Sequence, residues 1–185
     1  MRKVGGLLLA GALLLPAGVI AAGPAGSATT GLTCTKIAGT VTWTPPVPNN
    51  TTKVKSNTTI KSSVSGCTGT PAITSGVITL PLIKGTTPGN CTSLIGKPTK
   101  ITVPAGGSIL WATTKTKSVL GVLTLTPAGL ATYKASVKIA SGQFAAKTLT
   151  VTAQFTPVGG GCLKKGVALK SATLKVKAGT KITIK

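Results

Sequence analysis

Serine, threonine and lysine are the residues of this chain that could carry out covalent chemistry, because Asp, Glu and His are absent from its 185 positions. A Ser–Lys or Thr–Lys dyad is the one common catalytic arrangement that this composition permits. Ser93 lies close before Lys97, and Ser136 lies close before Lys138. Such spacings arise by chance in a chain rich in Thr and Lys, and a catalytic Lys must be buried enough to lose its proton. We therefore expect a protein that is not an enzyme, and we expect no catalytic residues.

The missing acids and histidines also exclude most other active sites. The chain has no carboxylate pair for glycoside hydrolysis and no Ser-His-Asp or Cys-His arrangement. It cannot build a His-based zinc site or a carboxylate cage for calcium or magnesium. We expect no metal site, no cofactor and no cofactor-binding residues.

Four cysteines, Cys34, Cys67, Cys91 and Cys162, are the remaining candidates for chemistry. They lack C-x-x-C spacing and are spread over most of the chain, so we expect structural disulfides rather than a redox or zinc site. Four cysteines allow three pairings.

The pairing can be narrowed by strand register. If the segments near 35–44 and 53–65 form a hairpin about the loop 45–50, the positions of opposed residues sum to about 101. Apolar residues then face each other, with Val41 opposite Ile60 and Ile37 opposite Val64. The same sum places Cys34 opposite Cys67, on the other parity of both strands, and cross-strand partners share a face. We therefore predict a Cys34–Cys67 disulfide, which leaves Cys91–Cys162 as the second one.

Period-2 alternation of apolar and polar residues dominates the chain after residue 29, and it predicts half-buried β-strands. Strands are expected near 35–44, 53–65, 72–83, 99–104, 107–115, 117–126, 132–139, 148–155 and 174–185. The fold class expected is all-β, a single antiparallel β-sandwich domain with two disulfides, and a β-barrel is the alternative. The sandwich is preferred because Pro45, Pro46 and Pro81 suggest strands that end or lie at a sheet edge.

The N-terminus has the pattern of a secretory signal peptide, with Arg2 and Lys3 before an apolar run and small residues after it. The expected division is a signal peptide over 1–28 and a single all-β domain over 29–185, with cleavage after Ala25 as the competitor of cleavage after Ala28. The run is shorter and more interrupted than a membrane anchor requires. No membrane span is expected after cleavage.

The net charge of +21 falls to +19 when the signal peptide is removed, and every remaining charge is a lysine. Such a field attracts polyanions. Sequence-specific nucleic-acid binding is not expected, because the mature chain has no Arg to read bases and few, scattered aromatic residues to stack on them. The expected partners are anionic envelope polymers or acidic surfaces, and the oligomeric state is left open.

The leading functional hypothesis is an exported, non-enzymatic β domain that associates electrostatically with anionic cell-envelope components. The expected location is secreted or cell-envelope associated. The first alternative is an oligomeric or membrane-associated β protein, such as a pore or surface-layer component. The second alternative is a Ser/Thr–Lys hydrolase.

Short motifs carry a resemblance to known sequences. They are Leu32–Thr35, Val64–Gly69, Asn90–Leu94, Gly107–Trp111 and the late Cys162. In this order they resemble a group of uncharacterised exported β-rich proteins of actinobacteria with no assigned activity. The resemblance implies a β-rich fold and export, and it implies no particular activity.

Overall fold

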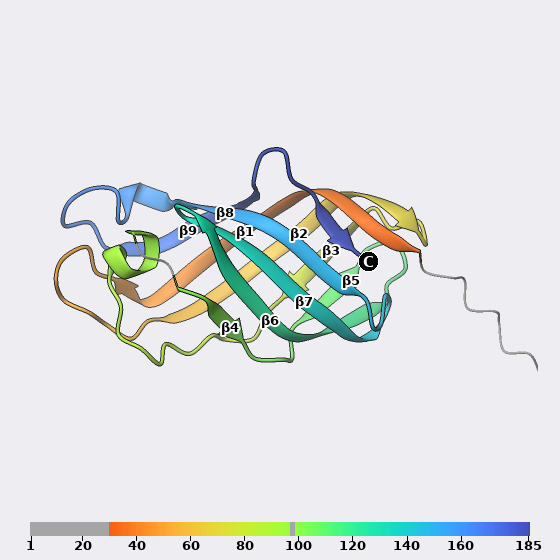
Figure 1. Ribbon diagram of the computed structural model, residues 1–185, viewed down its shortest axis with the longest axis horizontal. Coiled ribbons are helices and arrows are strands. Elements are labelled where there is room, and N and C mark those ends of the chain that lie inside the picture. The colour runs from red at the N-terminus through yellow and green to blue at the C-terminus, as the bar shows by residue number, and fades with distance from the viewer. Residues whose placement is uncertain (1–29, 97–98) are drawn as a thin grey trace, which may run out of the picture.

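Alternating segments of the sequence form antiparallel strands in the computed structural model, which describes residues 30–96 and 99–185 (Figure 1). Two short helical turns, η1 (Thr92–Gly96) and η2 (Val158–Gly160), lie between strands. The strands are β1 (Gly31–Val47), β2 (Asn57–Thr70), β3 (Ser75–Thr79), β4 (Ile101–Val103), β5 (Ser108–Trp111), β6 (Lys117–Gly129), β7 (Thr132–Gly142), β8 (Thr148–Pro157), β9 (Leu169–Val176) and β10 (Ile182–Ile184). The all-β, antiparallel expectation is confirmed.

Eight of these strands close into a barrel. Each strand in the series β1, β2, β3, β5, β6, β7, β8 and β9 pairs with the next, and β9 pairs back with β1. The two-sheet sandwich is therefore not confirmed, and the barrel alternative describes the pairing. Closure of these eight strands removes the two end edges that an open sheet would expose to edge-to-edge aggregation. The short strand β4 lies outside the series, pairs with β6 alone and keeps one edge without a strand partner among the described residues.

The prolines that favoured a sandwich lie where a barrel tolerates them. Pro45 and Pro46 follow the last pair between β1 and β2, Thr44 with Asn57, and fall where the register of β1 against β9 shifts. Pro81 lies after the end of β3. Because a proline cannot donate to a ladder, it is accepted at a bulge or beyond a strand end. These prolines mark irregular positions of the strands and not an open sheet edge.

The strand that closes the barrel is interrupted. Both β9 and β10 lie between β1 and β8, with Leu32 opposite Ile184 in one part and Ala38 opposite Lys175 in the other. Residues 177–181 form the loop that separates them, drawn in dark blue above the barrel in Figure 1. The single strand expected over 174–185 is therefore two short strands in one continuous direction.

The predicted hairpin register is confirmed. Val41 pairs with Ile60, Ile37 pairs with Val64 and Cys34 pairs with Cys67. The disulfides are Cys34–Cys67 and Cys91–Cys162, as predicted, with Cα–Cα distances of 3.9 Å and 5.2 Å.

The face of the hairpin changes near its first disulfide. Cys34 and Cys67 are buried although their parity opposes that of the buried Ile37 and Val64. The ladder lacks a pair between Thr35 and Gly66, and Gly66 has a φ of 61°, which is a glycine conformation. Both strands are irregular at the same point, so the residue pairing continues with the same register on either side of it. The residues that face the interior belong to one parity before this point and to the other parity after it.

One end of the barrel interior is filled by aromatic residues. The rings of Trp111 and Phe144 meet edge to face with centroids 5.6 Å apart, and both side chains are fully buried. The Trp111 indole Nε1 donates a hydrogen bond of 2.8 Å to Ser118 Oγ, and Ser118 Oγ donates to the Gln143 carbonyl. This packing fills the end of the interior near the Cys34–Cys67 disulfide.

The predicted signal peptide, residues 1–28, lies outside the part of the chain that the structure describes. Within the described ranges, the structure contains no helix with the length and apolar character needed to cross a membrane.

Candidate functional site

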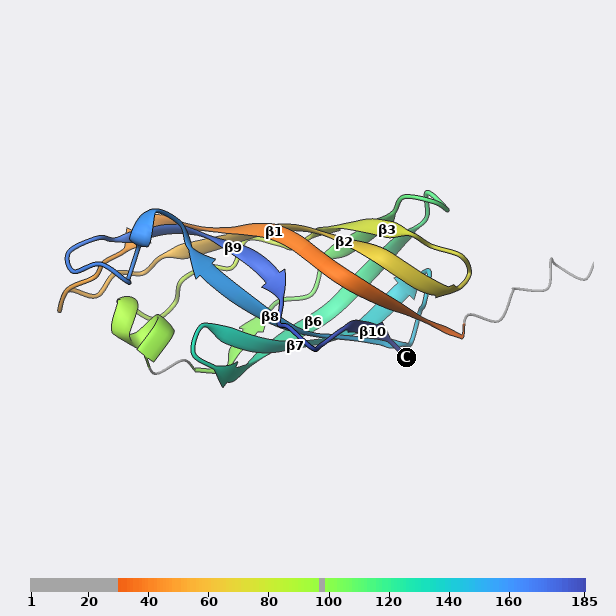
Figure 2. The ribbon, with the colours of Figure 1, turned by 90° about the horizontal axis from the view of Figure 1, so that it is seen from above.

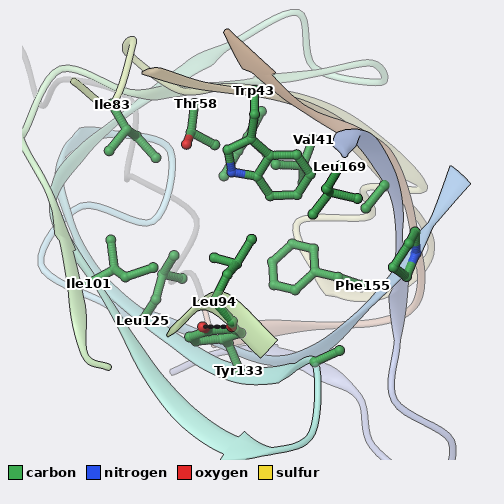
Figure 3. Close-up of a pocket in the computed structure, with 14 residues that line it drawn as sticks. Val41, Trp43, Thr58, Ile83, Leu94, Ile101, Leu125, Tyr133, Phe155 and Leu169 are labelled. Carbon is green, nitrogen blue, oxygen red and sulfur yellow. Dashed lines mark hydrogen bonds between the residues drawn. The ribbon is translucent and has the colours of Figure 1, made fainter. Parts of the chain in front are cut away.

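An apolar chamber occupies the barrel interior at the end away from Trp111 and Phe144. Inward-facing residues of β1, β6, β7, β8 and β9 surround it, including Val41, Trp43, Leu125, Tyr133 and Phe155 (Figure 3). The chamber has a volume of about 90 Å³. Trp43, Tyr133 and Phe155 lie on β1, β7 and β8, and all three line the chamber. Strand alternation thus supplies the walls of this chamber.

A second apolar chamber of about 70 Å³ lies deeper in the barrel. The first chamber is here called the upper chamber, and the second is called the lower chamber. The two chambers share Ile60, Leu125, Tyr133 and Phe155 in their walls. The Tyr133 and Phe155 rings meet edge to face at 5.5 Å. The interior is therefore a divided apolar space rather than a solid core at this end.

The mouth of the barrel carries a larger and more open groove of about 420 Å³, here called the mouth groove. Its walls come from the start of β2, from the segment between β3 and β4, and from β4. Five residues line both this groove and the upper chamber: Trp43, Thr58, Ile83, Leu94 and Ile101. The mouth groove is thus continuous in its walls with the apolar interior.

Residues 84–96, here called the cap segment, cover this end of the barrel, where the turn of η1 is seen in green in Figures 1 and 2. The Cys91–Cys162 disulfide ties the cap segment to the loop between β8 and β9. An isolated bridge joins Val54 to Gly89, and Asn90 Nδ2 donates a hydrogen bond of 3.0 Å to the Asn50 carbonyl. The cap segment is held to the barrel by contacts on two sides.

Tyr133 links the cap segment to the chamber. Its hydroxyl donates a hydrogen bond of 3.3 Å to the Leu94 carbonyl, drawn as a dashed line in Figure 3. Burial raises the pKa of the Tyr133 hydroxyl above its ordinary value of 10.0, because the charged phenolate loses hydration there. A neutral tyrosine therefore holds η1 over the chamber at physiological pH.

The lysines lie on the outside of the molecule. Of the 18 lysines in the described residues, 17 are exposed and Lys147 is half-buried. Lys84 and Lys100 line the mouth groove, whereas Lys36 and Lys175 line a shallow groove of about 430 Å³ between β1 and β9. Because the chain contains no Asp or Glu, no side-chain carboxylate can pair with any of them.

The structure places Ser93 and Ser136, the two serines considered for catalysis with a nearby lysine, in surroundings that do not favour a catalytic dyad. Ser93 Oγ donates to the Asn90 carbonyl at 2.8 Å and accepts from the Asn90 amide at 2.9 Å, which makes it part of a local turn. Its partner Lys97 lies outside the described residues. Ser136 lies on β7 with an exposed Lys138, so that Lys lacks the burial that catalysis requires.

All four cysteines of the chain form disulfides, in the predicted pairing. Two disulfides point to an oxidising environment of the extracellular kind. Across residues 30–96 and 99–185, the structure holds no cluster of three or more His, Cys, Asp or Glu side chains suited to a metal ion.

The sequence did not predict the two apolar chambers or the mouth groove. Alternation assigns a side chain to the inside of a fold, but it does not say whether the inward side chains of distant strands fill the space between them. The groove depends on how residues 84–96 cross the barrel mouth, and no periodic pattern marks that segment. Nothing in the sequence signals either feature.

No family model, no curated protein and no solved structure matches this chain. The resemblance to exported proteins of actinobacteria therefore stays a prediction.

Proposed function

We propose that this protein is an exported binding protein, without catalytic activity, that associates electrostatically with anionic components of the cell envelope. One observation carries the proposal: 17 of the 18 described lysines are exposed in a chain that has no Asp or Glu. An uncompensated positive surface of this kind attracts phosphate- and carboxylate-bearing polymers over distances comparable to the Debye length. The two disulfides support an extracellular setting for that encounter.

The arrangement of the lysines supports attachment without sequence or shape selectivity. Lys36 and Lys175 lie beside the shallow groove of β1 and β9, while Lys134 and Lys138 lie on the outer face of β7. The lysine ammonium is a compact charge on a flexible side chain, so it can bind phosphate from many directions. The planar guanidinium of arginine binds phosphate in a more fixed geometry. A surface spread over several strands therefore suits an extended polymer better than a single small anion.

Sedimentation with isolated envelopes of the producing cells, over a series of NaCl concentrations, tests this proposal. Binding should be strong at about 50 mM NaCl and should fall steeply towards about 500 mM as counterions compete. Inorganic polyphosphate immobilised on beads should behave in the same way, and neutral dextran beads should not bind. Absent or salt-independent binding to envelopes would overturn the proposal.

A pair of matched variants separates charge from structure. Replacing Lys36, Lys134, Lys138 and Lys175 by Gln should weaken envelope binding and flatten its salt dependence. Replacing the same four residues by Arg keeps the charge and should keep the binding. Equal losses in the Gln and Arg variants would show that charge does not drive the association.

A further inference from the structure

The mouth groove joins an apolar chamber to a pair of lysines. Ile83 and Leu94, shown in Figure 3, line both the groove and the upper chamber, while Lys84 and Lys100 line the groove alone. In Figure 3 the side chains of Ile83, Leu94 and Ile101 point towards the same interior space as Trp43. An apolar interior that opens beside two cations is the shape of a site for a ligand with an apolar part and an anionic end.

The two lysines at the groove have no internal partner. Both are exposed, and the sequence offers no Asp or Glu to neutralise them. A lysine on an ordinary protein surface has carboxylates nearby that compete with a ligand for its charge. Here the only anions that can reach Lys84 and Lys100 through side-chain chemistry come from outside the chain, because its own side chains supply none.

Ser56 provides a second and independent observation. Its Oγ is buried, has no hydrogen-bond partner, and belongs to a residue that lines the mouth groove. A buried hydroxyl without a partner costs free energy, so native proteins leave few of them. Because the Oγ has almost no accessible surface in this conformation, the Ser56 side chain must rotate about χ1 before its hydroxyl can donate to a ligand oxygen in the groove.

We propose that the mouth groove binds a single-chain amphiphile with an anionic head group. Its apolar chain enters the upper chamber between Trp43 and Leu94, and its head group lies in the groove near Lys84 and Lys100. After rotation of its side chain, the Ser56 hydroxyl donates a hydrogen bond to an oxygen of that head group. This site is distinct from the surface proposed above for envelope polymers, because it needs a particular pair of lysines and an apolar interior.

The cavity volumes set the length of the chain. The upper chamber measures about 90 Å³, whereas an apolar cavity of about 150 Å³ holds a molecule as large as benzene. The upper chamber therefore accepts roughly four carbon atoms, and the wider groove takes the remainder of the chain. Medium-length chains of roughly eight to twelve carbons fit this division between an interior segment and a groove segment.

Calorimetric titration of the full mature protein with hexanoate, octanoate, decanoate and dodecanoate, each below its micelle concentration, tests the proposal. We expect saturable binding of one molecule, with affinity rising about fourfold per added methylene until the interior is filled. Decanol, which has the same chain as decanoate and no charge, should bind about tenfold more weakly, because it gains nothing from the two lysines. Octyl phosphate tests whether a phosphate head is accepted in place of a carboxylate.

Tryptophan fluorescence locates the ligand. Trp43 and Trp111 are the two tryptophans of the chain, and only Trp43 lines the chamber and the groove. In the Trp111→Phe variant, which keeps Trp43, decanoate should change the emission in proportion to the calorimetric saturation. In the Trp43→Phe variant, which keeps Trp111 at the packed end, the emission should stay unchanged.

Charge variants separate this site from general attraction of anions. Lys84→Gln with Lys100→Gln should weaken decanoate binding about tenfold and leave decanol binding unchanged. Lys117→Gln with Lys138→Gln removes the same net charge from exposed positions on β6 and β7, and it should leave both affinities unchanged. Equal losses from the two pairs would mean that decanoate meets only the overall field, which overturns the site while leaving the envelope proposal standing.

Ser56→Ala gives a readout that a structural role would not. Removing an unpartnered buried hydroxyl should leave the melting temperature unchanged or higher. The same variant should bind decanoate several-fold more weakly, because the head group loses a donor. Decanoate affinity unchanged in Ser56→Ala and in the Lys84/Lys100 variant, or no saturable binding of any chain up to dodecanoate, would overturn the proposal.

Discussion

At the scale of single residues, Tyr133 shows how a side chain with one polar atom is accommodated in the apolar interior. Its ring forms part of the wall of both chambers, and its hydroxyl holds the Leu94 carbonyl of η1. The side chain is mainly apolar and has one polar end, so it lines the chamber and holds the element above it at the same time. Because it is the one tyrosine of the chain, its ionisation can be followed without interference from another phenol.

We expect the Tyr133 phenol in the folded protein to ionise above its ordinary pKa of 10.0, because burial disfavours the phenolate. The unfolded chain, in guanidinium, should ionise near that ordinary value. A raised folded pKa means that the unfolded state loses its proton first. Stability is therefore unaffected by this group below pH 10 and falls as the pH rises through the folded pKa.

Absorbance of the phenolate, measured against pH in native and denaturing buffer, checks the Tyr133 prediction. The Tyr133→Phe variant is the control for stability, because it lacks the phenol and keeps every other side chain of the protein. The difference in unfolding free energy between the two should narrow above pH 10. Coincident native and denatured titration curves would contradict the expectation.

At the scale of elements, the two disulfides have different tasks. Cys34–Cys67 joins paired positions of β1 and β2, which many ladder hydrogen bonds already hold together. Cys91–Cys162 joins the cap segment to the loop between β8 and β9, where few ladder bonds exist. The first fastens one hairpin of the barrel, whereas the second keeps residues 84–96 over its mouth.

Replacing Cys91 and Cys162 by Ala should lower the free energy of unfolding by about 2–4 kcal/mol, because the loop closed by this disulfide is lost from the constraints on the unfolded chain. It should also release the cap segment, so the amide protons of Val54 and Gly89 should exchange faster than those of β7. Hydrogen exchange followed by mass spectrometry or NMR measures both effects.

The matched control replaces Cys34 and Cys67 by Ala. This variant should lose a comparable amount of global stability, because its disulfide spans 33 residues against 71 for the other and loop entropy grows slowly with length. Exchange at Val54 and Gly89 should follow global unfolding only. Selective loosening of the cap segment in the control, or its absence in the Cys91/Cys162 variant, would refute the assignment of tasks.

The elements also show how far the sequence determines this fold. Alternation located the strands, and one register sum predicted the opposition of Val41 to Ile60 and both disulfides. The C-terminal alternation continued through Ala178 and Thr180, which are small enough to fit either a strand or a loop. Gly179, with a φ of 76°, turns the chain there, and a periodic pattern of residue types does not record that angle.

Closure of the barrel was beyond such reasoning for a physical reason. Alternation determines which side chains share a face, and it is the same in a sandwich and in a barrel. The pairing of β1 with β9 joins segments far apart in the chain, such as Val41 with Ala172, and no local signal specifies it. The chambers follow from closure, and for this reason the candidate site could be read only from the folded chain.

At the scale of the whole molecule, positive charge opposes folding without internal relief. Residues 29–185 contain 19 lysines and no Asp or Glu, so folding brings like charges together and forms no side-chain ion pair. The apolar interior and two disulfides must offset that repulsion. Added salt shortens the range of the repulsion, from a Debye length of about 30 Å at 0.01 M to about 8 Å at 0.15 M.

The melting temperature should therefore rise with NaCl concentration. A relief of about 1 kcal/mol corresponds to a rise of about 2–4 °C for a domain of this size. Differential scanning calorimetry between low and moderate salt measures the rise, and sucrose at matched osmolality serves as the uncharged control. Replacing exposed lysines by Gln should reduce the slope, and a melting temperature that is flat or falls with NaCl would contradict the expectation.

The two strands that close the barrel, β9 and β10, also determine when the ring of strands can be completed during folding. β1, the first strand described, is completed on one side only by residues 169–184, the last strands described. Until residues 169–184 are in place, β1 and β8 are open edges that can pair with another chain. Docking of β9 and β10 is therefore the step that turns an aggregation-prone open sheet into a closed ring.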